Sequence, residues 1–361
     1  MAELLKNQFF QPAFIQKLGE KIKSTSSQFK VEPFEKDIFN SEWDSLELKG
    51  RMTHIALALG SHLPEEYERA IEVLSQIVHE FEGFNGMVFP EFTRLFGLDH
   101  WLVSMNALEL FTQYSSGEFA IRHFILQEER KTMNKMLEWS QHSNHHVRRL
   151  SSEGCRPRLP WAMALPNFKK DPGLVLSILE NLKADESEYV RKSVANNLND
   201  ITKDNPDSVI DLCKKWKTRD SRTALIIKHG LRSLVKAGNP MALKLLGFNA
   251  ADVDIRNFKI SPETLQLGEE VTLEFDIHNQ GKGVANLHID YIMHFKKANG
   301  TNTPKVFKLS TIKLEPGQKE KLSKAHKIYA ITTRKYYPGK QIVEIQINGK
   351  ALAKESFDLT I

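Results

Sequence analysis

Apolar residues recur at the spacing of an α-helix from Leu63 to about Ala250. Two stripes show the pattern, each after a proline that suits the first turn of a helix: Ile71, Leu74, Ile77, Val78 and Phe81 follow Pro64, and Leu174, Ile178, Leu179 and Leu182 follow Pro172. Glycine and proline separate such runs. This part of the chain is therefore predicted to consist of successive amphipathic helices.

Two stretches of the helical segment resemble each other. HSNHHVRRLSSEG (142–154) and DESEYVRKSVANN (185–197) both place a valine, an arginine and a second basic residue shortly after a polar cluster. Their offset, from Val147 to Val190, is 43 residues. HEAT and armadillo repeats have periods of about 40–47 residues, and their helix pairs stack into a solenoid with a concave binding face. We therefore predict an all-α, HEAT-like repeat solenoid for residues 1–250.

The pattern changes near Asp252. From there Val, Ile, Phe and Thr alternate with polar residues in short runs: IRNFKI, VTLEFDIHNQ, ANLHIDYIMHF, KVFKLSTIKL, QIVEIQI and ALAKESFDLTI. Asn348-Gly349, between the last two runs, is typical of a type I′ hairpin turn. About seven short strands predict an all-β, immunoglobulin-like sandwich for residues 252–361. The sequence lacks the Cys…Trp…Cys core of antibody domains. We therefore predict the sandwich architecture and not membership of the immunoglobulin family.

Length and composition agree with two globular domains. The chain has 361 residues, of which 41% are apolar and 26% charged. The start, MAELLKNQFFQPAF, lacks a signal-peptide pattern, and no apolar run approaches the ~18–20 residues of a membrane span. A cytoplasmic location without membrane contact is expected. Cys155 and Cys213 are expected to be reduced thiols, and His145-His146 a solvated pair, because no metal-ligand spacing appears. No metal and no cofactor are predicted.

Charge is distributed unevenly along the chain. Lys and Arg number 10 against 18 acidic residues in 1–121, 22 against 14 in 122–236, and 17 against 13 in 251–361. The basic middle segment favours a polyanionic partner, because Lys and Arg displace counterions from phosphates. Solvated helix faces are the alternative explanation of these charges.

The segment SEYVRKSVANNLNDITKD (187–204) contains the densest group of candidate residues. It is predicted to be a helix that opens with Asp185 and Glu188 in capping-box spacing. Val190, Val194, Leu198 and Ile201 form its apolar stripe, and Lys192, Asn196, Asn199 and Lys203 share the opposite face. A plain amphipathic helix explains the lysines. Asparagine is a poor helix former, however, and Asp200 lies at the helix end where the dipole favours cations, so these residues point to function.

Two further segments carry candidate chemistry. VRRLSSEGCRPRLPWA (147–162) holds four arginines, Arg148, Arg149, Arg156 and Arg158, and a proline-stiffened loop of this kind suits bidentate phosphate contacts. Trp161 follows Pro160 and would ordinarily be a core aromatic at a helix start. In SSGEFAIRHF (115–124), Glu118 stands three residues after Ser115, so a capping box is the structural alternative to a catalytic role.

RRLSSEGCRPRLPWA, SEYVRKSVANNLNDI and SGEFAIR resemble the signature stretches of AlkC-type DNA alkylation repair proteins, distant relatives of the HEAT-repeat AlkD glycosylases. The resemblance covers most of residues 50–250, and some members carry an immunoglobulin-like domain after the helices. It implies that Glu118 and Asp200 are the active-site carboxylates and Trp161 the aromatic beside the damaged nucleotide. The DNA-binding candidates are Arg148, Arg149, Arg156, Arg158, Arg191, Lys192 and Asn196.

The resemblance also implies the reaction: hydrolysis of the N-glycosidic bond of 3-methyladenine and 3-methylcytosine in double-stranded DNA, without deep base flipping. Alkylation at N3 makes the base cationic and weakens this bond, so carboxylates need only stabilise an oxocarbenium-like sugar and position water. No obligatory protein partner is evident. One alternative is a non-catalytic HEAT-repeat protein that binds DNA structure, and another is a protein–protein scaffold.

Overall fold

A computed structural model describes residues 8–216 and 220–361. Contacts divide the chain into two compact units, one of Met1–Val209 with Trp216–Gly230 and one of Ile210–Lys215 with Leu231–Ile361. The first seven residues of the predicted helical domain lie outside the described part. Within the described ranges, no helix has the length and apolar character that a bilayer span requires.

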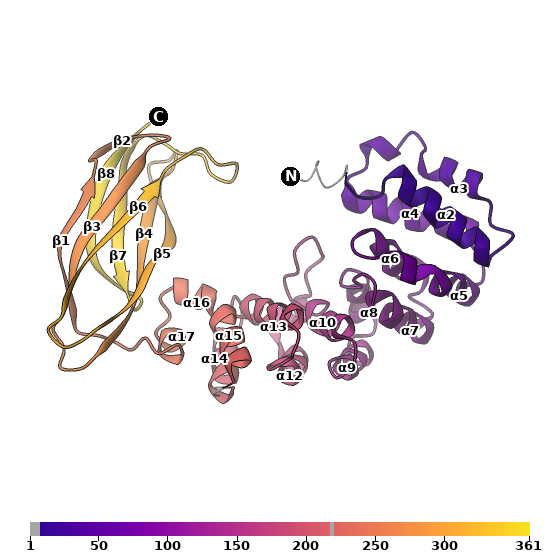
Figure 1. The fold of residues 1–361 in the computed structure, drawn as a ribbon, viewed down its shortest axis with the longest axis horizontal. Coiled ribbons are helices and arrows are strands. Elements are labelled where there is room, and N and C mark those ends of the chain that lie inside the picture. The colour runs from indigo at the N-terminus through magenta and orange to yellow at the C-terminus, as the bar shows by residue number, and fades with distance from the viewer. Residues whose placement is uncertain (1–7, 217–219) are drawn as a thin grey trace. The chain divides into compact units, whose positions relative to one another are not determined.

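The first unit is built from helices (Figure 1). Its α-helices are α2 (Pro12–Thr25), α3 (Val31–Ile38), α4 (Leu48–His62), α5 (Tyr67–Ile77), α6 (Val88–Phe96), α7 (Trp101–Thr112), α8 (Ile121–Gln127), α9 (Glu129–Trp139), α10 (His145–Glu153), α11 (Pro166–Lys170), α12 (Gly173–Leu182), α13 (Glu188–Ile201) and α15 (Ser221–Gly230). Short 3-10 turns are η1 (Trp43–Ser45), η2 (Val78–Glu80) and η3 (Asn85–Met87). Helix α14 (Pro206–Lys215) begins in the first unit and ends in the second.

The predicted repeat is confirmed in α9–α10 and α12–α13. Helix α10 packs against α13 and α9 against α12, so two similar helix pairs stack on each other. Val147 and Val190 occupy equivalent positions and are both fully buried. The next residue has the same task in each pair: Nη1 of Arg148 donates to the carbonyls of residues 142 and 143, and Nη1 of Arg191 donates to those of residues 185 and 186. Each arginine thereby clasps the turn before its own helix.

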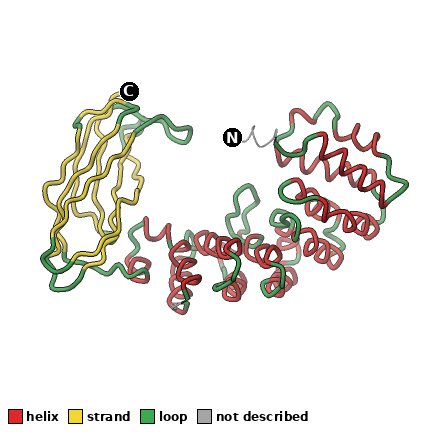
Figure 2. Tube along the Cα trace, viewed as in Figure 1, coloured by secondary structure: helices red, strands yellow, loops and turns green. Residues whose placement is uncertain are grey.

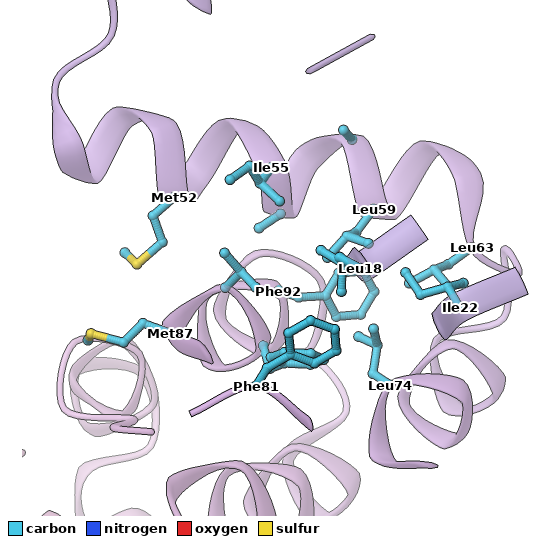
Figure 3. Packing of buried hydrophobic residues seen from close by; sticks show 14 of the residues in the cluster. Leu18, Ile22, Met52, Ile55, Leu59, Leu63, Leu74, Phe81, Met87 and Phe92 are labelled. Atoms are coloured by element: carbon cyan, nitrogen blue, oxygen red, sulfur yellow. The ribbon is translucent and has the colours of Figure 1, made fainter. Parts of the chain in front are cut away.

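Helices α2 to α6 enclose the N-terminal core (Figure 3). Side chains such as Leu18 of α2, Ile55 and Leu59 of α4 and Leu74 of α5 are fully buried in it. The same core receives Leu159, which comes from the loop after α10 and is 5% exposed. We call this loop, residues 154–165, the Trp161 loop. It projects from the row of helices (Figure 2), and its inner side is packed against the N-terminal helices.

The second unit contains helices α16 (Arg232–Lys236) and α17 (Pro240–Leu245) and a two-sheet sandwich, which confirms the predicted β architecture. One sheet has the order β1-β3-β6 and the other β2-β8-β7-β4-β5. The strands are β1 (Val253–Ser261), β2 (Thr264–Gln266), β3 (Glu270–Asn279), β4 (Ala285–Lys296), β5 (Asn302–Leu314), β6 (Lys319–Lys327), β7 (Gly339–Ile347) and β8 (Lys350–Thr360). Alternate residues of β3 and β4 face the core between the sheets, as the polar alternation predicted.

The β7–β8 turn is the predicted hairpin. Asn348 has φ 47° and Gly349 φ 83°, the two positive angles that a type I′ turn needs. This turn lies against the loop before α17, because a Cβ added to Gly349 would come within 2.5 Å of the carbonyl oxygen of Gly238. The Asn348 amide also donates to the carbonyl of Asn249 at 2.7 Å. The change from helices to strands falls between Leu245 and Val253. The second compact unit begins earlier along the chain, because helices α16 and α17 group with the strands.

Candidate active site

Five charged side chains of alternating sign form a continuous row at α10, α13 and the turn before α8: Glu118, Arg149, Glu153, Arg156 and Asp200. Arg149 contacts Glu118 through Nη1, and its Nη2 lies 3.4 Å from Oε1 of Glu153. Nη1 of Arg156 reaches the same Glu153 oxygen at 2.6 Å. Nε and Nη2 of Arg156 both lie 2.8 Å from Oδ2 of Asp200.

Local helical spacing and helix packing together build this row. Arg149 and Glu153 are four residues apart on α10, so they lie one turn above each other. Arg156 follows directly after the helix and turns back to Glu153. Asp200 comes from the last turn of α13, which the repeat packs against α10. The row therefore depends on the stacking of two repeats.

The row is largely buried, and Glu153 and Asp200 accept hydrogen bonds on both carboxylate oxygens. Glu153 and Asp200 are only 5% and 4% exposed. Ser193 donates to Oε2 of Glu153 at 2.6 Å, and Lys203 lies 3.3 Å from Oδ1 of Asp200. Three carboxylates face two guanidiniums in the row, and the ammonium of Lys203 adds a third positive group beside Asp200.

The carboxylates also keep both guanidiniums charged. Burial alone would lower the pKa of Arg149, but the charges of Glu118 and Glu153 outweigh it and raise that pKa. For Arg156 the same balance between burial and the charges of Glu153 and Asp200 raises the pKa above its usual value. Both guanidiniums therefore carry a full positive charge at neutral pH.

Glu118 ends the row and is part of no capping box. Helix α8 begins at Ile121, and the Ser115 hydroxyl donates to the carbonyl of Gly83 instead. The Glu118 carboxylate accepts from the hydroxyl of Ser116 at 2.8 Å, in addition to Arg149. The capping alternative is thus wrong, because this carboxylate points toward α10 and not toward the backbone of α8. Glu118 also borders a surface cavity of about 470 Å³.

Trp161 is neither a core residue nor at a helix start, so that interpretation is wrong. Its side chain is 62% exposed, and it stands within the Trp161 loop, five residues before α11 begins. Its φ is +62°, in the left-handed region, which costs a non-glycine residue ~1–2 kcal/mol. Arg156 belongs to the same loop, so one segment carries both the exposed indole and the guanidinium that binds Asp200.

Several arginines that were predicted to bind phosphates have hydrogen-bond acceptors within the protein. Arg148 and Arg191 clasp the turns of their repeats, and Arg148 also pairs with Asp185 at 2.6 Å. The side chains of Arg149 and Arg156 are 12% and 9% exposed and lie within the row. All four guanidiniums donate to carboxylates or carbonyls of the protein.

The remaining DNA-binding candidates lie at the surface. Arg158 is 38% exposed and pairs with Asp204 at 2.8 Å, and Lys192 is 68% exposed and pairs with Glu188 one helical turn away. Asn196 is half-buried, with its amide oxygen 3.2 Å from a ring nitrogen of His229. Arg158 and Lys192 keep their positive charges accessible to a polyanion, whereas Asn196 offers only its amide.

Helix α13 differs from its prediction in two respects. It begins at Glu188 with Ser187 as N-cap, and Asp185 accepts from the backbone N–H of Ser187, so the predicted capping box is wrong. Asn199 is 5% exposed and does not share a solvated face with Lys192. Asn197 is fully buried and donates to the carbonyl of Ser152 at 2.7 Å, which ties α13 to α10.

Sequence reasoning missed Glu153 and its hydroxyl partner Ser193. Glu153 stands in the quoted stretch RRLSSEGCR, four residues after Arg149 and three before Arg156. That spacing places an acid between two bases on one helix face and could have identified it. Among the residues with a described position, no group of three or more His, Cys, Asp or Glu is arranged to hold a metal ion.

Comparisons with known proteins agree with this geometry. A family model described as "DNA alkylation repair enzyme" matches residues 89–234, and one described as "Uncharacterised protein YhaZ, C-terminal Ig-like domain" matches residues 254–361. The class is thus a helical DNA alkylation repair domain followed by an immunoglobulin-like domain.

Two full-length similarities narrow this class. The chain is 38% identical to the "Uncharacterized protein YhaZ" of Bacillus subtilis (strain 168) over 362 residues, which is 100% of both chains. The structure of "Pseudomonas fluorescens alkylpurine DNA glycosylase AlkC bound to DNA containing an abasic site analog" matches 98% of each chain with a TM-score of 0.92 and 38% identity. The chain therefore belongs to the AlkC-type DNA alkylation repair family.

Proposed function

We propose that this protein is a DNA glycosylase that hydrolyses the N-glycosidic bond of cationic alkylated bases, chiefly 3-methyladenine and 3-methylcytosine. The observation that carries the proposal is the buried row of alternating charges, with Asp200 bound to the loop that presents Trp161. The similarity to an alkylpurine DNA glycosylase solved with DNA supports the same reaction class.

The proposed chemistry needs no proton for the leaving base. The bond between C1′ and the base nitrogen breaks, and its electron pair neutralises the positive charge of the alkylated base. The sugar becomes oxocarbenium-like, and water then adds its oxygen to C1′ and gives a proton to solvent. Asp200 and Glu118, as the catalytic carboxylates, would stabilise this cation.

Arg149 and Arg156 act in this mechanism as positioning residues. A carboxylate that must turn toward the substrate during the reaction loses part of its stabilising effect to reorganisation, whereas a fixed one does not. Arg156 holds Asp200 through two nitrogens, and Arg149 holds Glu118. We therefore assign these two arginines to the carboxylates and not to the DNA backbone.

The exposed groups would bind the DNA itself. The indole face of Trp161 would lie beside the damaged nucleotide and attract its cationic base by ~0.5–2 kcal/mol, depending on desolvation. Arg158 and Lys192 would exchange their exposed carboxylate partners for phosphates, and Asn196 would donate through its amide. Because the lesion is read by its charge, a base that stays stacked could react without deep flipping.

Release of free bases from methylated DNA tests the proposal. Full-length protein is incubated with duplexes containing 3-methyladenine or 3-methylcytosine and, as a control, with a duplex containing a neutral lesion such as uracil. We expect abasic sites and free base from the cationic lesions alone. Binding of alkylated DNA without any release would refute the catalytic proposal and favour the non-catalytic DNA-structure-binding alternative.

A further inference from the structure

The Trp161 loop is held at both ends by one buried cation. Arg122 is fully buried, and its Nη1 donates to the carbonyls of Gly154 at 2.9 Å and Arg156 at 2.7 Å. Its Nε donates to the carbonyl of Met163, also at 2.9 Å. Burial lowers the pKa of Arg122 to about 10, which still leaves the guanidinium charged at neutral pH. The two ends of the loop are thus tied to a single group.

A second cation holds the middle of the loop at the strained residue itself. Nζ of Lys49, on α4, donates to the carbonyl of Trp161 at 2.7 Å and lies 4.2 Å from the centre of the Phe119 ring. Backbone conformations of this kind persist only where the surrounding structure enforces them, and they occur preferentially at functional sites. Among the residues that the structure describes, the side chain of Lys49 donates a hydrogen bond to the Trp161 carbonyl.

A cavity lies behind the loop, next to this hydrogen bond. This cavity of about 160 Å³ lies between α4, α6 and the loop, and Lys49, Ala162 and Met163 are among the residues that line it. Without the Lys49 hydrogen bond, the backbone at Trp161 could relax to a negative φ, and the loop could move toward this cavity. Leu159 would still be anchored in the N-terminal core.

We propose that Lys49 and Arg122 form a latch that positions Trp161 beside the proposed active site, so that Lys49 acts on the reaction through the indole without touching the substrate. This inference rests on the proposed glycosylase function. It predicts that loss of Lys49 displaces Trp161 and slows base excision while DNA affinity and the fold remain intact.

Lys49→Met is the variant of choice, because deleting the fully buried Arg122 would threaten the fold. Lys17→Met is a matched control: Nζ of Lys17 also donates to a backbone carbonyl, that of Glu80 at 2.9 Å, and also lies over a phenylalanine, Phe81, at 4.9 Å. It has no contact with the Trp161 loop. Lys49→Arg tests rescue, since it restores a cationic donor.

Fluorine NMR of protein labelled with 5-fluorotryptophan measures the latch without reference to activity. The chain has five tryptophans, and Trp161→Phe identifies the Trp161 resonance. In Lys49→Met we expect that resonance to shift or broaden while the other four stay in place, with partial recovery in Lys49→Arg and no change in Lys17→Met. An unmoved Trp161 resonance in a folded Lys49→Met protein would overturn the latch.

Single-turnover excision of 3-methyladenine then tests the link to the reaction. We expect Lys49→Met to lower the rate at saturating enzyme by about 10- to 100-fold, the range that follows from misplacing a group by about 1 Å, with Kd for undamaged duplex within about twofold. A displaced indole with a parental rate would overturn its positioning role. If the parental protein excises no base, the proposed function fails while the NMR result still decides whether the latch exists.

Discussion

Asp200→Asn keeps the shape of the side chain and removes one negative charge from the row of Glu118, Arg149, Glu153, Arg156 and Asp200. One of the two carboxylates that we assign to cation stabilisation then loses its charge, while Arg149, Arg156 and Lys203 keep theirs. Losing one such preorganised group costs about 10²–10³ in rate, or roughly 2.7–4 kcal/mol of transition-state stabilisation. Because the interaction develops only with the sugar cation, DNA affinity should stay at the parental level.

The stability cost of this change should be smaller than that of deleting the side chain. Removing one partner of a buried ion pair costs about 3–5 kcal/mol. Asparagine still offers one oxygen to Arg156, which is 2.8 Å away, and Arg156 keeps its contact with Glu153. We therefore expect a loss of about 1–3 kcal/mol in the free energy of unfolding, the range for a weakened buried hydrogen bond. The variant should remain folded at 25 °C.

Single-turnover excision of 3-methyladenine, binding of undamaged duplex and thermal melting are measured together. Asp204→Asn is the matched control, because Asp204 also pairs with an arginine of the Trp161 loop, Arg158 at 2.8 Å, but lies outside the row. The control should excise at close to the parental rate. A parental rate in folded Asp200→Asn refutes the proposed mechanism, and equal slowing in both variants would indicate general damage to the loop.

Three further outcomes are expected. Glu118→Gln should slow excision as Asp200→Asn does, with DNA affinity unchanged; a parental rate would restrict the catalytic role to Asp200. The logarithm of DNA affinity should fall linearly with the logarithm of salt concentration, by about 0.9 per neutralised phosphate, and an affinity that ignores salt would contradict phosphate binding. Edge strand β6 exposes several lysines, and replacing them by glutamine should weaken DNA binding and excision. Lys350→Gln on β8 should have neither effect. Equal binding by all variants would show that β6 does not contact the DNA. The exposed β6 lysines to replace are Lys319, Lys321, Lys324 and Lys327.

Local patterns were sufficient to predict most of the fold. The 43-residue offset between Val147 and Val190 identified the repeat because equivalent core positions recur in stacked helix pairs. Asn348-Gly349 identified its hairpin because few other residue pairs accept two positive φ angles. Strand β6 was not among the predicted strands, since KEKLSKAHK lies at a sheet edge and exposes its lysines, which removes the apolar alternation.

The orientation of the arginines could not be predicted in the same way. Nothing in the sequence near Arg156 shows that its acceptor is Asp200, 44 positions further along the chain. That pairing exists only after α13 has packed on α10. The contacts around Trp161 are equally non-local, because Lys49 and Arg122, which bind the carbonyls of its loop, come from α4 and α8. The sequence therefore predicts candidate segments, and only tertiary packing shows which of their charged side chains pair with each other.

The contact between Gly238 and Gly349 has a consequence for recombination of this protein with its relatives. Neither glycine leaves room for a Cβ, and both have positive φ, so the pair forms a tightly matched seam between the α16–α17 loop and the β7–β8 hairpin. A chimera joined at residue 252 would place the α16–α17 loop of one protein against the β7–β8 hairpin of another. Exchanging residues 231–361 as one block keeps the seam intact, so shuffled family members should express best when their crossover lies before α16.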